Sequence, residues 1–569
     1  MTNLLILFVS YFIVSISLIG YGNLFFKFFT KKYKTINFGY LGIFGLVFSI
    51  FIAYLSNFFI PHNYIFNSIY IILGIFGFIL LFREFKIYVL KKDFYLFFSI
   101  FILAFISLLI FKNHDDFSYY HFVYTYNLTQ FDLLVGTGQF NHGFRTPSSI
   151  FYINSLFYLP LIKYFSFNFA AVFVLGFSNI ILLKKIRIIN SKKFNFNNKT
   201  IIKNDCVVFF SLLSLIFINI FFYRIGEHGT DRSAQILIMI LASEVLSVLT
   251  SRTKYYEMNL KIYALLIFII SLKAFYILYL LILIPIYIYY SNFYKFTDLI
   301  KKNIMNSYII IFFIIFLFII SSYFFSSGCL IYPVKITCFE NFSWSIPIIQ
   351  VENMNVWYQQ WSKAGAGPDF RIDNPEVYIK YFNWVGNWID KYFFNKVSDF
   401  LLGIIFLSLI IFITYSKISV KKTKIDLNKY QIIFYFLILI LFLEWFYNHP
   451  SLRYGGFSLV ALIFFLPLSI KLSSFKINTN KFQITTIILI FITASVFTGR
   501  NLNRINNERV LYKYNPLEDA FYKVKNSYFQ ENKNILDKIS NYQNCEINNT
   551  CKEDEIKIKK KFGKYIFEN

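Results

Sequence analysis

The residues best suited to chemistry lie close together in the segment 113–121, whose sequence is NHDDFSYYH. This segment follows Phe94–Phe111, an apolar run long enough to cross a bilayer. Adjacent carboxylates at the mouth of a membrane helix are costly to place there without a use. One carboxylate of the pair Asp115 and Asp116 can act as general base on an attacking hydroxyl. The other can position that hydroxyl or hold a divalent cation, Mg or Mn, through its oxygens.

Less specific interpretations of these residues remain open. Asp115 and Asp116 would also serve as a polar cap on an interfacial helix. His114 and His121 are supporting candidates beside the pair, although a lone histidine is often an ordinary interface residue. A zinc site is compatible with the residue types, but the spacing matches no standard ligand pattern.

A second polar segment, residues 224–232, lies at the end of another apolar run. It contains two carboxylates, a histidine and an arginine that would support catalysis or bind substrate: Glu227, His228, Asp231 and Arg232. These side chains either line the same cavity as the acidic pair or form a solvated loop.

Two further sites carry basic groups suited to phosphate. Lys273 interrupts the long apolar run Ile262–Tyr290, which predicts two short helices that meet at the outer surface. Lys273 either extends to the interface or contacts a phosphate. Arg453 and Tyr454 follow Pro450 in a late polar segment, and guanidinium is the group best suited to bidentate phosphate recognition. An ordinary interface anchor is the alternative interpretation.

The elements that must position these residues are membrane helices. The chain has 569 residues, is 57% hydrophobic and has a mean hydropathy of +0.55, which excludes a soluble protein. Its apolar runs predict an all-α polytopic membrane protein with about fourteen transmembrane helices. The net charge is +26, and the Lys and Arg residues that produce it are concentrated in short loops between these runs, as in the cytoplasmic loops of membrane proteins. We therefore expect a lipid bilayer as partner and no nucleic acid.

The charge pattern predicts three regions. Residues 1–93 form N-terminal transmembrane helices, residues 94–498 form the catalytic membrane domain, and residues 499–569 form a small polar extramembrane tail. Four outer loops are expected, at residues 112–167, 224–233, 326–399 and 448–456. The topology places all three polar segments and Lys273 on the same face of the membrane, although they are far apart in the chain.

The cysteines agree with this orientation. Cys329 with Cys338, and Cys545 with Cys551, are local pairs on the same outer face, suited to disulfides in an oxidising compartment. Cys206 stands alone at the start of an apolar run.

The pattern resembles the GT-C superfamily of polytopic glycosyltransferases, which includes the protein O-mannosyltransferases. Shared features are the acidic pair in an outer loop after a span, the interfacial segments in that loop, the broken hairpin with Lys273 at its tip, and the late Pro450-x-x-Arg453-Tyr454. In that superfamily the acidic pair usually follows the first span, whereas here it follows the fourth.

The resemblance implies a sugar donor on a polyprenyl phosphate or diphosphate and a glycan, lipid or protein acceptor. Asp115 or Asp116 would deprotonate the acceptor hydroxyl, with inversion at the anomeric carbon, while Arg453 and Lys273 neutralise the departing phosphate. The location would be a bacterial inner membrane, with the active site facing the periplasm. Two alternatives remain: a glycan polymerase or ligase, and a transporter or flippase of lipid-linked sugars, for which Glu244 and Glu444 inside apolar runs are the best evidence.

Overall fold

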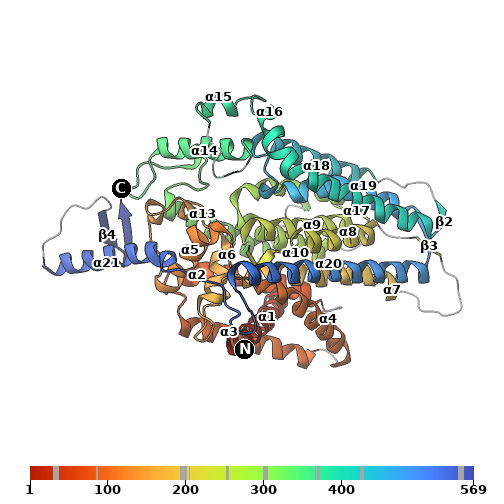
Figure 1. The fold of residues 1–569 in the computed structure, drawn as a ribbon, viewed down its shortest axis with the longest axis horizontal. Helices are drawn as coiled ribbons and strands as arrows, with labels where there is room; N and C mark the ends of the chain where they lie inside the picture. Colours follow the sequence, from red (N-terminus) through yellow and green to blue (C-terminus); the bar gives the residue numbers. More distant parts are fainter. Residues whose placement is uncertain are drawn as a thin grey trace.

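The computed structural model describes residues 1–29, 37–84, 87–191, 201–203, 206–227, 229–250, 255–295, 297–298, 301, 306–365, 367, 372–422, 428–548 and 557–568. The chain is predominantly helical (Figure 1). The helices of the first half are α1 (Thr2–Phe29), α2 (Phe38–Asn57), α3 (Tyr64–Glu84), α4 (Ile87–Phe105), α5 (Phe122–Gln130), α6 (Ser149–Ser155), α7 (Phe169–Ser191), α8 (Cys206–Phe221), α9 (Thr230–Thr250), α10 (Tyr255–Leu272) and α11 (Leu283–Tyr290). Those of the second half are α13 (Ser307–Ser327), α14 (Ile348–Lys363), α15 (Pro375–Ile379), α16 (Val385–Trp388), α17 (Ser398–Lys417), α18 (Lys429–Asn448), α19 (Gly456–Ser473), α20 (Thr479–Tyr512) and α21 (Gln530–Asn548).

The helices identify a polytopic membrane protein, as the sequence predicts. Within the described ranges, ten helices are long and apolar enough to cross a membrane, and three apolar helices are shorter. The expected total of about fourteen spans stays a prediction. At the centre, α7 is buried along its apolar length and packs against α2, α4, α8 and α9. Reciprocal amide hydrogen bonds of 3.0 and 2.7 Å join Asn179 of α7 to Asn219 of α8.

The long apolar run at 262–290 is interrupted at Lys273, as predicted. Helix α10 ends at Leu272, and Lys273 has an extended backbone with φ −157° and ψ 136°. A 3₁₀ segment, Ala274–Ile282, then leads into α11. The break places a basic side chain at the turn between two short helices, because a cation is costly inside the hydrocarbon region.

The span predicted at Phe94–Phe111 is shifted in the structure. Helix α4 ends at Phe105, and one 3₁₀ turn follows at Ile106–Leu108. The chain then runs without regular structure to residue 114, and Asp115 and Asp116 begin a helical turn that is π-helical over Phe117–His121. We call residues 106–116 the acid loop. Its backbone groups lack helical partners and need bonds from elsewhere.

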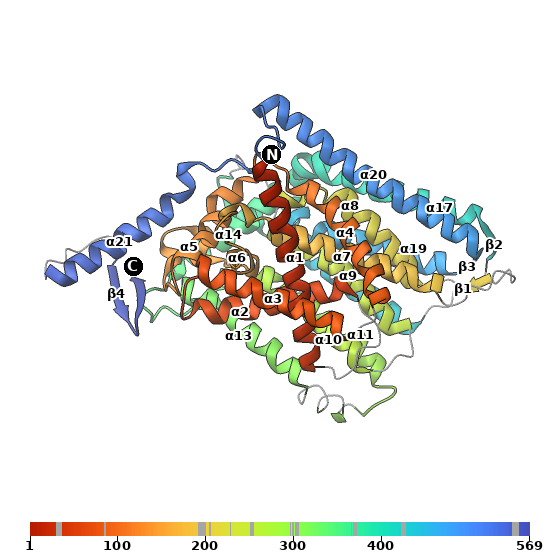
Figure 2. The same cartoon turned by 90° about the horizontal axis from the view of Figure 1, so that it is seen from below.

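Two small sheets were not predicted. The first joins three loops in the order β1 (Ile201–Lys203), β3 (Phe475–Asn478), β2 (Ser419–Lys422), with antiparallel pairs Ile201↔Asn478 and Ser419↔Ile477. The second is the C-terminal hairpin β4 (Lys557–Lys561) and β5 (Lys564–Glu568). Figures 1 and 2 show the first sheet at one end of the molecule and α21 with the hairpin at the other.

The predicted boundary at residue 499 stays a prediction, but no break in secondary structure marks it, because residue 499 lies inside α20. This helix continues for another four turns to Tyr512, since its polar C-terminal half finds partners on the acid loop. The tail then returns to the segment 112–167. Phe567 N donates to Val135 O at 2.9 Å, and Val135 N donates to Tyr565 O at 3.0 Å.

The cysteines occupy the expected kind of positions. A disulfide joins Cys329 and Cys338, the pair suggested by their spacing. Cys545 is disulfide-bonded, and Cys551 lies outside the described residues. Cys206 is buried at the start of α8, where its Sγ accepts a hydrogen bond from Gln431 Nε2 at 3.5 Å.

Candidate functional site

Four charged side chains from distant parts of the chain form one ion-pair cluster. Arg453 connects the two carboxylates: its Nη2 contacts Asp116 Oδ2, and its Nε donates to Asp231 Oδ2 at 2.7 Å. Lys273 Nζ lies 2.6 Å from Asp231 Oδ1. We call these four residues the ion-pair cluster. All four belong to the segments that the sequence places on one face.

Local structure explains how each residue reaches the cluster. Asp116 immediately precedes the π-helical turn, and Asp231 lies in the first turn of α9, where the helix dipole favours a carboxylate. Arg453 is in a 3₁₀ turn that ends at Gly455, whose φ of 97° suits glycine. Lys273 sits at the break described above. Helix ends and turns therefore supply all four groups.

The Arg453 turn is held rigidly by side-chain hydrogen bonds. Trp388 Nε1 donates to Pro450 O, and Trp445 Nε1 donates to Ser451 O, both at 2.9 Å. Gln235 of α9 donates to Arg453 O at 3.0 Å, one helical turn beyond Asp231. The backbone on both sides of Arg453 is thus fixed before any ligand binds.

Charge pairing sets the ionisation of the cluster outside the membrane helices. Burial alone raises the pKa of Asp116, but the Arg453 guanidinium and the neighbouring histidines outweigh it and lower the pKa below its ordinary value. Burial lowers the pKa of His121 to about 3 and also lowers that of His114. At neutral pH Asp116 is therefore ionised and both histidines are neutral.

The acidic pair divides between two environments. The Asp116 side chain is 27% exposed within the cluster, and His114 Nδ1 accepts from its backbone N–H at 3.2 Å. The Asp115 side chain is 87% exposed and pairs with Lys112 at 3.3 Å. Asp115 thus does not reach the cluster, because consecutive residues at this turn point in different directions.

The remaining residues predicted to support catalysis or bind substrate lie beside the ion-pair cluster or away from it. Tyr454 lies beneath the Lys273 ammonium, 4.8 Å from the ring centroid. His121 is buried and lines a small cavity together with Asn154 and Asn168. The Arg232 guanidinium faces the Phe222 ring at 6.0 Å, and His228 lies outside the described residues.

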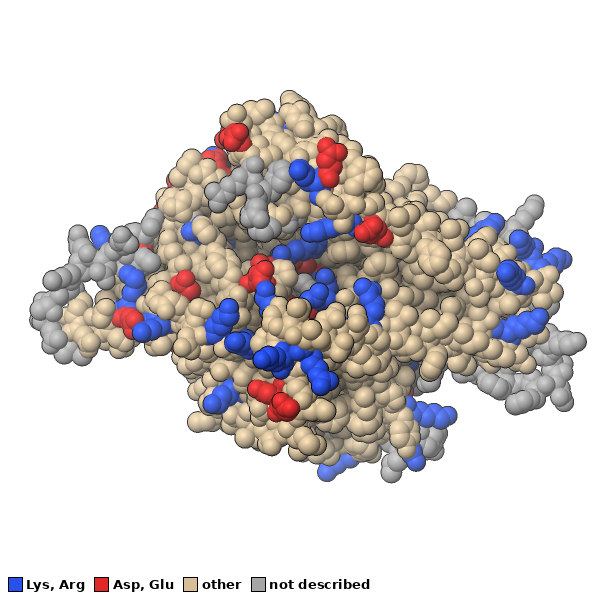
Figure 3. Space-filling model, viewed as in Figure 1, with Lys and Arg blue, Asp and Glu red and all other residues tan. Residues whose placement is uncertain are grey.

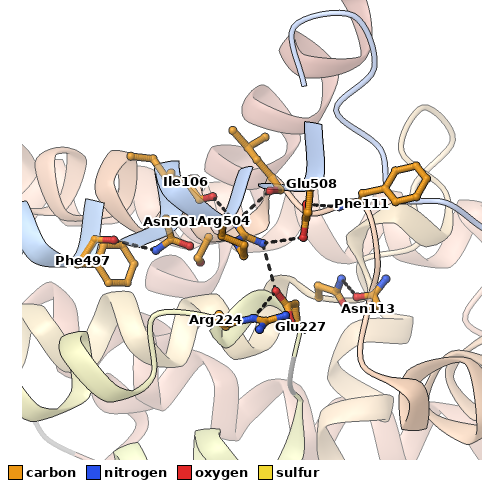
Figure 4. A network of polar contacts seen from close by, with 12 residues as sticks. Ile106, Phe111, Asn113, Arg224, Glu227, Phe497, Asn501, Arg504 and Glu508 are labelled. Atoms are coloured by element: carbon orange, nitrogen blue, oxygen red, sulfur yellow. Dashed lines mark hydrogen bonds and ion pairs between the residues drawn. The ribbon is translucent and has the colours of Figure 1, made fainter. Parts of the chain in front are cut away.

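Glu227 belongs to a second network, shown in Figure 4. Arg224 donates from Nε to both Glu227 oxygens at 2.9 Å, and Arg504 of α20 approaches one of them at 3.4 Å. Glu227 is therefore paired on two sides. The sequence left two positions open for Glu227, in the cavity of the acidic pair or in a solvated loop. In the structure it is buried and paired with Arg224 and Arg504.

The same network supports the acid loop through α20. Arg504 Nη2 donates to Ile106 O at 3.3 Å and to Leu109 O at 3.0 Å. One turn later, Glu508 Oε2 accepts from Phe111 N at 2.9 Å. Sequence analysis missed both residues because the tail carries no chemical motif. The only sequence feature that could have identified them is the i, i+4 spacing of their opposite charges.

The cluster is partly exposed, since the side chains of Arg453 and Asp116 are 31% and 27% exposed. Figure 3 shows Lys, Arg, Asp and Glu side chains around a hollow in the middle of one face of the molecule. Near the end of α14, the Trp361 ring lies 5.8 Å from that of Tyr454. Aromatic faces beside paired charges suit a ligand with both apolar and anionic parts.

The arrangement does not suit a divalent cation. Such a site needs several oxygen ligands, but Arg453 and Lys273 already neutralise both carboxylates of the cluster, and Asp115 points away. Among the described residues no group of three His, Cys, Asp or Glu side chains could hold a metal ion. The two basic side chains can instead supply positive charge directly.

Comparison with known proteins adds a family. No curated protein and no solved structure matches the chain. The family described as "Domain of unknown function (DUF8201)" matches residues 4–460. Because this range spans most of the 569 residues and includes the whole ion-pair cluster, the chain belongs to the DUF8201 family.

Proposed function

We propose that this protein is an integral membrane glycosyltransferase of GT-C type, which transfers a sugar from a polyprenyl-phosphate donor to an acceptor hydroxyl. The observation that carries the proposal is the ion-pair cluster. A partly exposed carboxylate there contacts a guanidinium that also touches a second, buried carboxylate. This combination supplies a base and a phosphate-binding group within one site.

Each residue of the cluster would have a distinct role in the reaction. Asp116 accepts the proton of the acceptor hydroxyl, whose oxygen attacks the anomeric carbon from the face opposite the phosphate. The bond between the anomeric carbon and the phosphate oxygen breaks, and the electron pair leaves with the polyprenyl phosphate. Arg453 and Lys273 neutralise the charge that develops on that oxygen. The product is an inverted glycoside.

The two carboxylates would have different roles because their exposure differs. Asp231 is 7% exposed and is held by Arg453 and Lys273 at once, so it orients both cations. Asp116 contacts only Arg453 among these basic groups and remains accessible. A donor phosphate that binds Arg453 would compete with Asp116 and release its Oδ2 for proton transfer.

An outward-facing site in a bacterial inner membrane completes the proposal. Lys and Arg gather at the end of the molecule that holds β2 and β3, with no acidic side chains visible there in Figure 3. Basic loops are retained in the cytoplasm. The cluster belongs to the opposite set of loops and would therefore face the periplasm.

Transport of a lipid-linked sugar has less support. That hypothesis requires charged side chains within spans that are free to bind cargo. Glu244 of α9 instead pairs with Lys185 of α7 at 2.5 Å and accepts from the Tyr40 hydroxyl. This pair joins central helices, which favours a structural role.

Transfer of labelled sugar from a pool of polyprenyl-phosphate sugars, in membranes that contain the protein, tests the proposal. We expect Asp116→Asn to abolish labelled product and Asp115→Asn, its exposed neighbour, to retain it. Equal turnover in the two variants would contradict the assignment of the base. Labelled lipid that changes leaflet without any product would contradict the enzyme class and favour a flippase.

A further inference from the structure

Arg145 is a buried cation outside the ion-pair cluster, and its hydrogen-bond partners are neutral. The residue is 5% exposed. Its Nε donates to Gly138 O at 2.8 Å, its Nη1 to the Tyr332 hydroxyl at 3.3 Å, and its Nη2 to Gln350 Oε1 at 3.4 Å. Among the described residues no carboxylate forms an ion pair with Arg145. A buried charge without a counter-ion is costly, so the position suits an anion supplied by a ligand.

Arg145 adjoins the segment that carries the candidate base. It ends the 3₁₀ turn His142–Arg145, which packs against the π-helical turn directly after Asp116. At Gly143 the approach is so close that a Cβ would lie 2.2 Å from Tyr120 Cγ, so only glycine fits. An anion bound at Arg145 would therefore lie near the turn that follows Asp116.

Helix α14 has one contact with Arg145 and another with the neighbour of Arg453. Gln350 contacts Arg145 near the start of this helix, and Trp361 contacts Tyr454, the residue after Arg453, near its end. At about 1.5 Å per residue these two positions are roughly 16 Å apart along the axis. The two arginines therefore lie near different parts of α14, so an anion at Arg145 is better assigned to an acidic group of the other substrate than to the phosphate bound at Arg453.

Access requires little rearrangement. Gln350 is exposed, whereas Tyr332 is buried behind the guanidinium. A ligand oxygen would displace only the exposed Gln350 amide from Nη2 and could then accept a charge-assisted hydrogen bond.

We propose that Arg145 is a second anion-binding group, which receives a carboxylate or phosphate of an acidic acceptor while Arg453 receives the donor phosphate. This inference rests on the proposed glycosyl transfer for its roles of donor and acceptor. The binding itself is independent of turnover, so it can be measured separately.

Tryptophan fluorescence titrations of the purified full-length protein provide the test. The acidic probes are tri-galacturonic acid and glucose 6-phosphate, the neutral controls are the trisaccharide methyl ester and glucose, and inorganic pyrophosphate reports on Arg453. We expect wild type to bind at least one acidic probe about tenfold more tightly than its neutral control. Arg145→Gln should remove this preference but keep pyrophosphate affinity, Arg145→Lys should retain part of it, and Arg453→Gln should show the converse.

Gln350→Glu separates binding from folding. It would place a carboxylate within reach of Arg145 Nη2 and pair the charge internally. We expect this variant to unfold at or above the wild-type temperature and to lose the preference for acidic probes. A wild type without the preference, or a preference that survives in Arg145→Gln or Gln350→Glu, would overturn the proposal. Loss of pyrophosphate binding in Arg145→Gln would assign Arg145 to a second donor phosphate instead. Sugar transfer is not read out, so failure here leaves the proposed function standing.

Discussion

Replacing Asp231 by Asn should destabilise the protein far more than replacing Asp116 by Asn, although both changes are single oxygen-to-nitrogen substitutions. Asp231 touches two cations, at 2.6 and 2.7 Å, and is almost fully buried. Its loss leaves Arg453 and Lys273 facing each other without their common counter-ion. Asp116 is more exposed and contacts only one of these cations.

The magnitudes follow from burial. At charge separations of about 4 Å and an effective dielectric of about 20, each Asp231 pair attracts by about 4 kcal/mol before desolvation. Removing one partner from such a buried pair costs about 3–5 kcal/mol net. For Asp116, solvent screening reduces the cost to about 1–2 kcal/mol. The difference of about 2 kcal/mol corresponds to as much as about a 30-fold faster unfolding rate for Asp231→Asn.

The assay is the rate of thermal unfolding of purified protein in detergent, with and without inorganic pyrophosphate. Pyrophosphate should slow unfolding of Asp231→Asn more than that of wild type, because it can replace the missing anion between the two cations. Asp537→Asn, an exposed change on α21, is the control and should behave as wild type. Equal unfolding rates for Asp231→Asn and Asp116→Asn, with no effect of pyrophosphate, would refute this account of the cluster.

Three further predictions concern turnover under the proposed function. Arg504→Gln should lower kcat about 10- to 100-fold with little change in KM, because the acid loop loses two carbonyl contacts. Arg504→Lys should restore part of the rate, and Arg509→Gln, an exposed change on the same helix, should not alter it. A change confined to KM would contradict this role. The rate of transfer should be independent of pH from about 5 to 8. The pKa of Asp116 lies below its ordinary value, and burial lowers the pKa of His121 to about 3 and that of His449 to about 4. Because the folded pKa of Asp116 is the lower one, its ion pair is complete above its unfolded pKa of about 4 and is lost as the pH falls through the folded value. A rate limb near pH 6.5 that disappears in a His121→Asn variant would contradict this ionisation. Chelation with EDTA should leave transfer intact, because basic side chains already neutralise the carboxylates, and recovery on adding Mg²⁺ after a loss would refute it.

The site residues that could be predicted from the sequence are charged residues in or beside apolar runs, where a charge is energetically costly unless it has a function. Lys273 interrupts an apolar run, so its place at a helix break followed from the cost of a buried cation. Asp231 and Arg453 were expected on one face because basic loops orient the spans. Their direct contact depends on packing between α9 and α19 and could not be derived from spacing.

Other features depend on tertiary partners that no local pattern reveals. Adjacent residues Asp115 and Asp116 have the same chemistry, and only the turn that follows decides which of them meets Arg453. From the sequence, the polar C-terminal half of α20 is indistinguishable from an extramembrane tail. In the structure, the acid loop provides hydrogen-bond partners for its Arg504 and Glu508. Strands of three or four residues, such as β1 and β3, are too short to give a periodic signal.

The central strand of the three-stranded sheet limits how far this protein can be truncated from its C-terminus. β3 lies between β1 and β2 and begins after residue 460, where the similarity to the family ends. A fragment that stops at 460 would leave both outer strands without a ladder and the Phe111 amide without its Glu508 acceptor. The smallest piece that can be expected to fold with a complete site therefore extends at least to Tyr512. The cooperative unit is longer than the stretch of recognisable similarity.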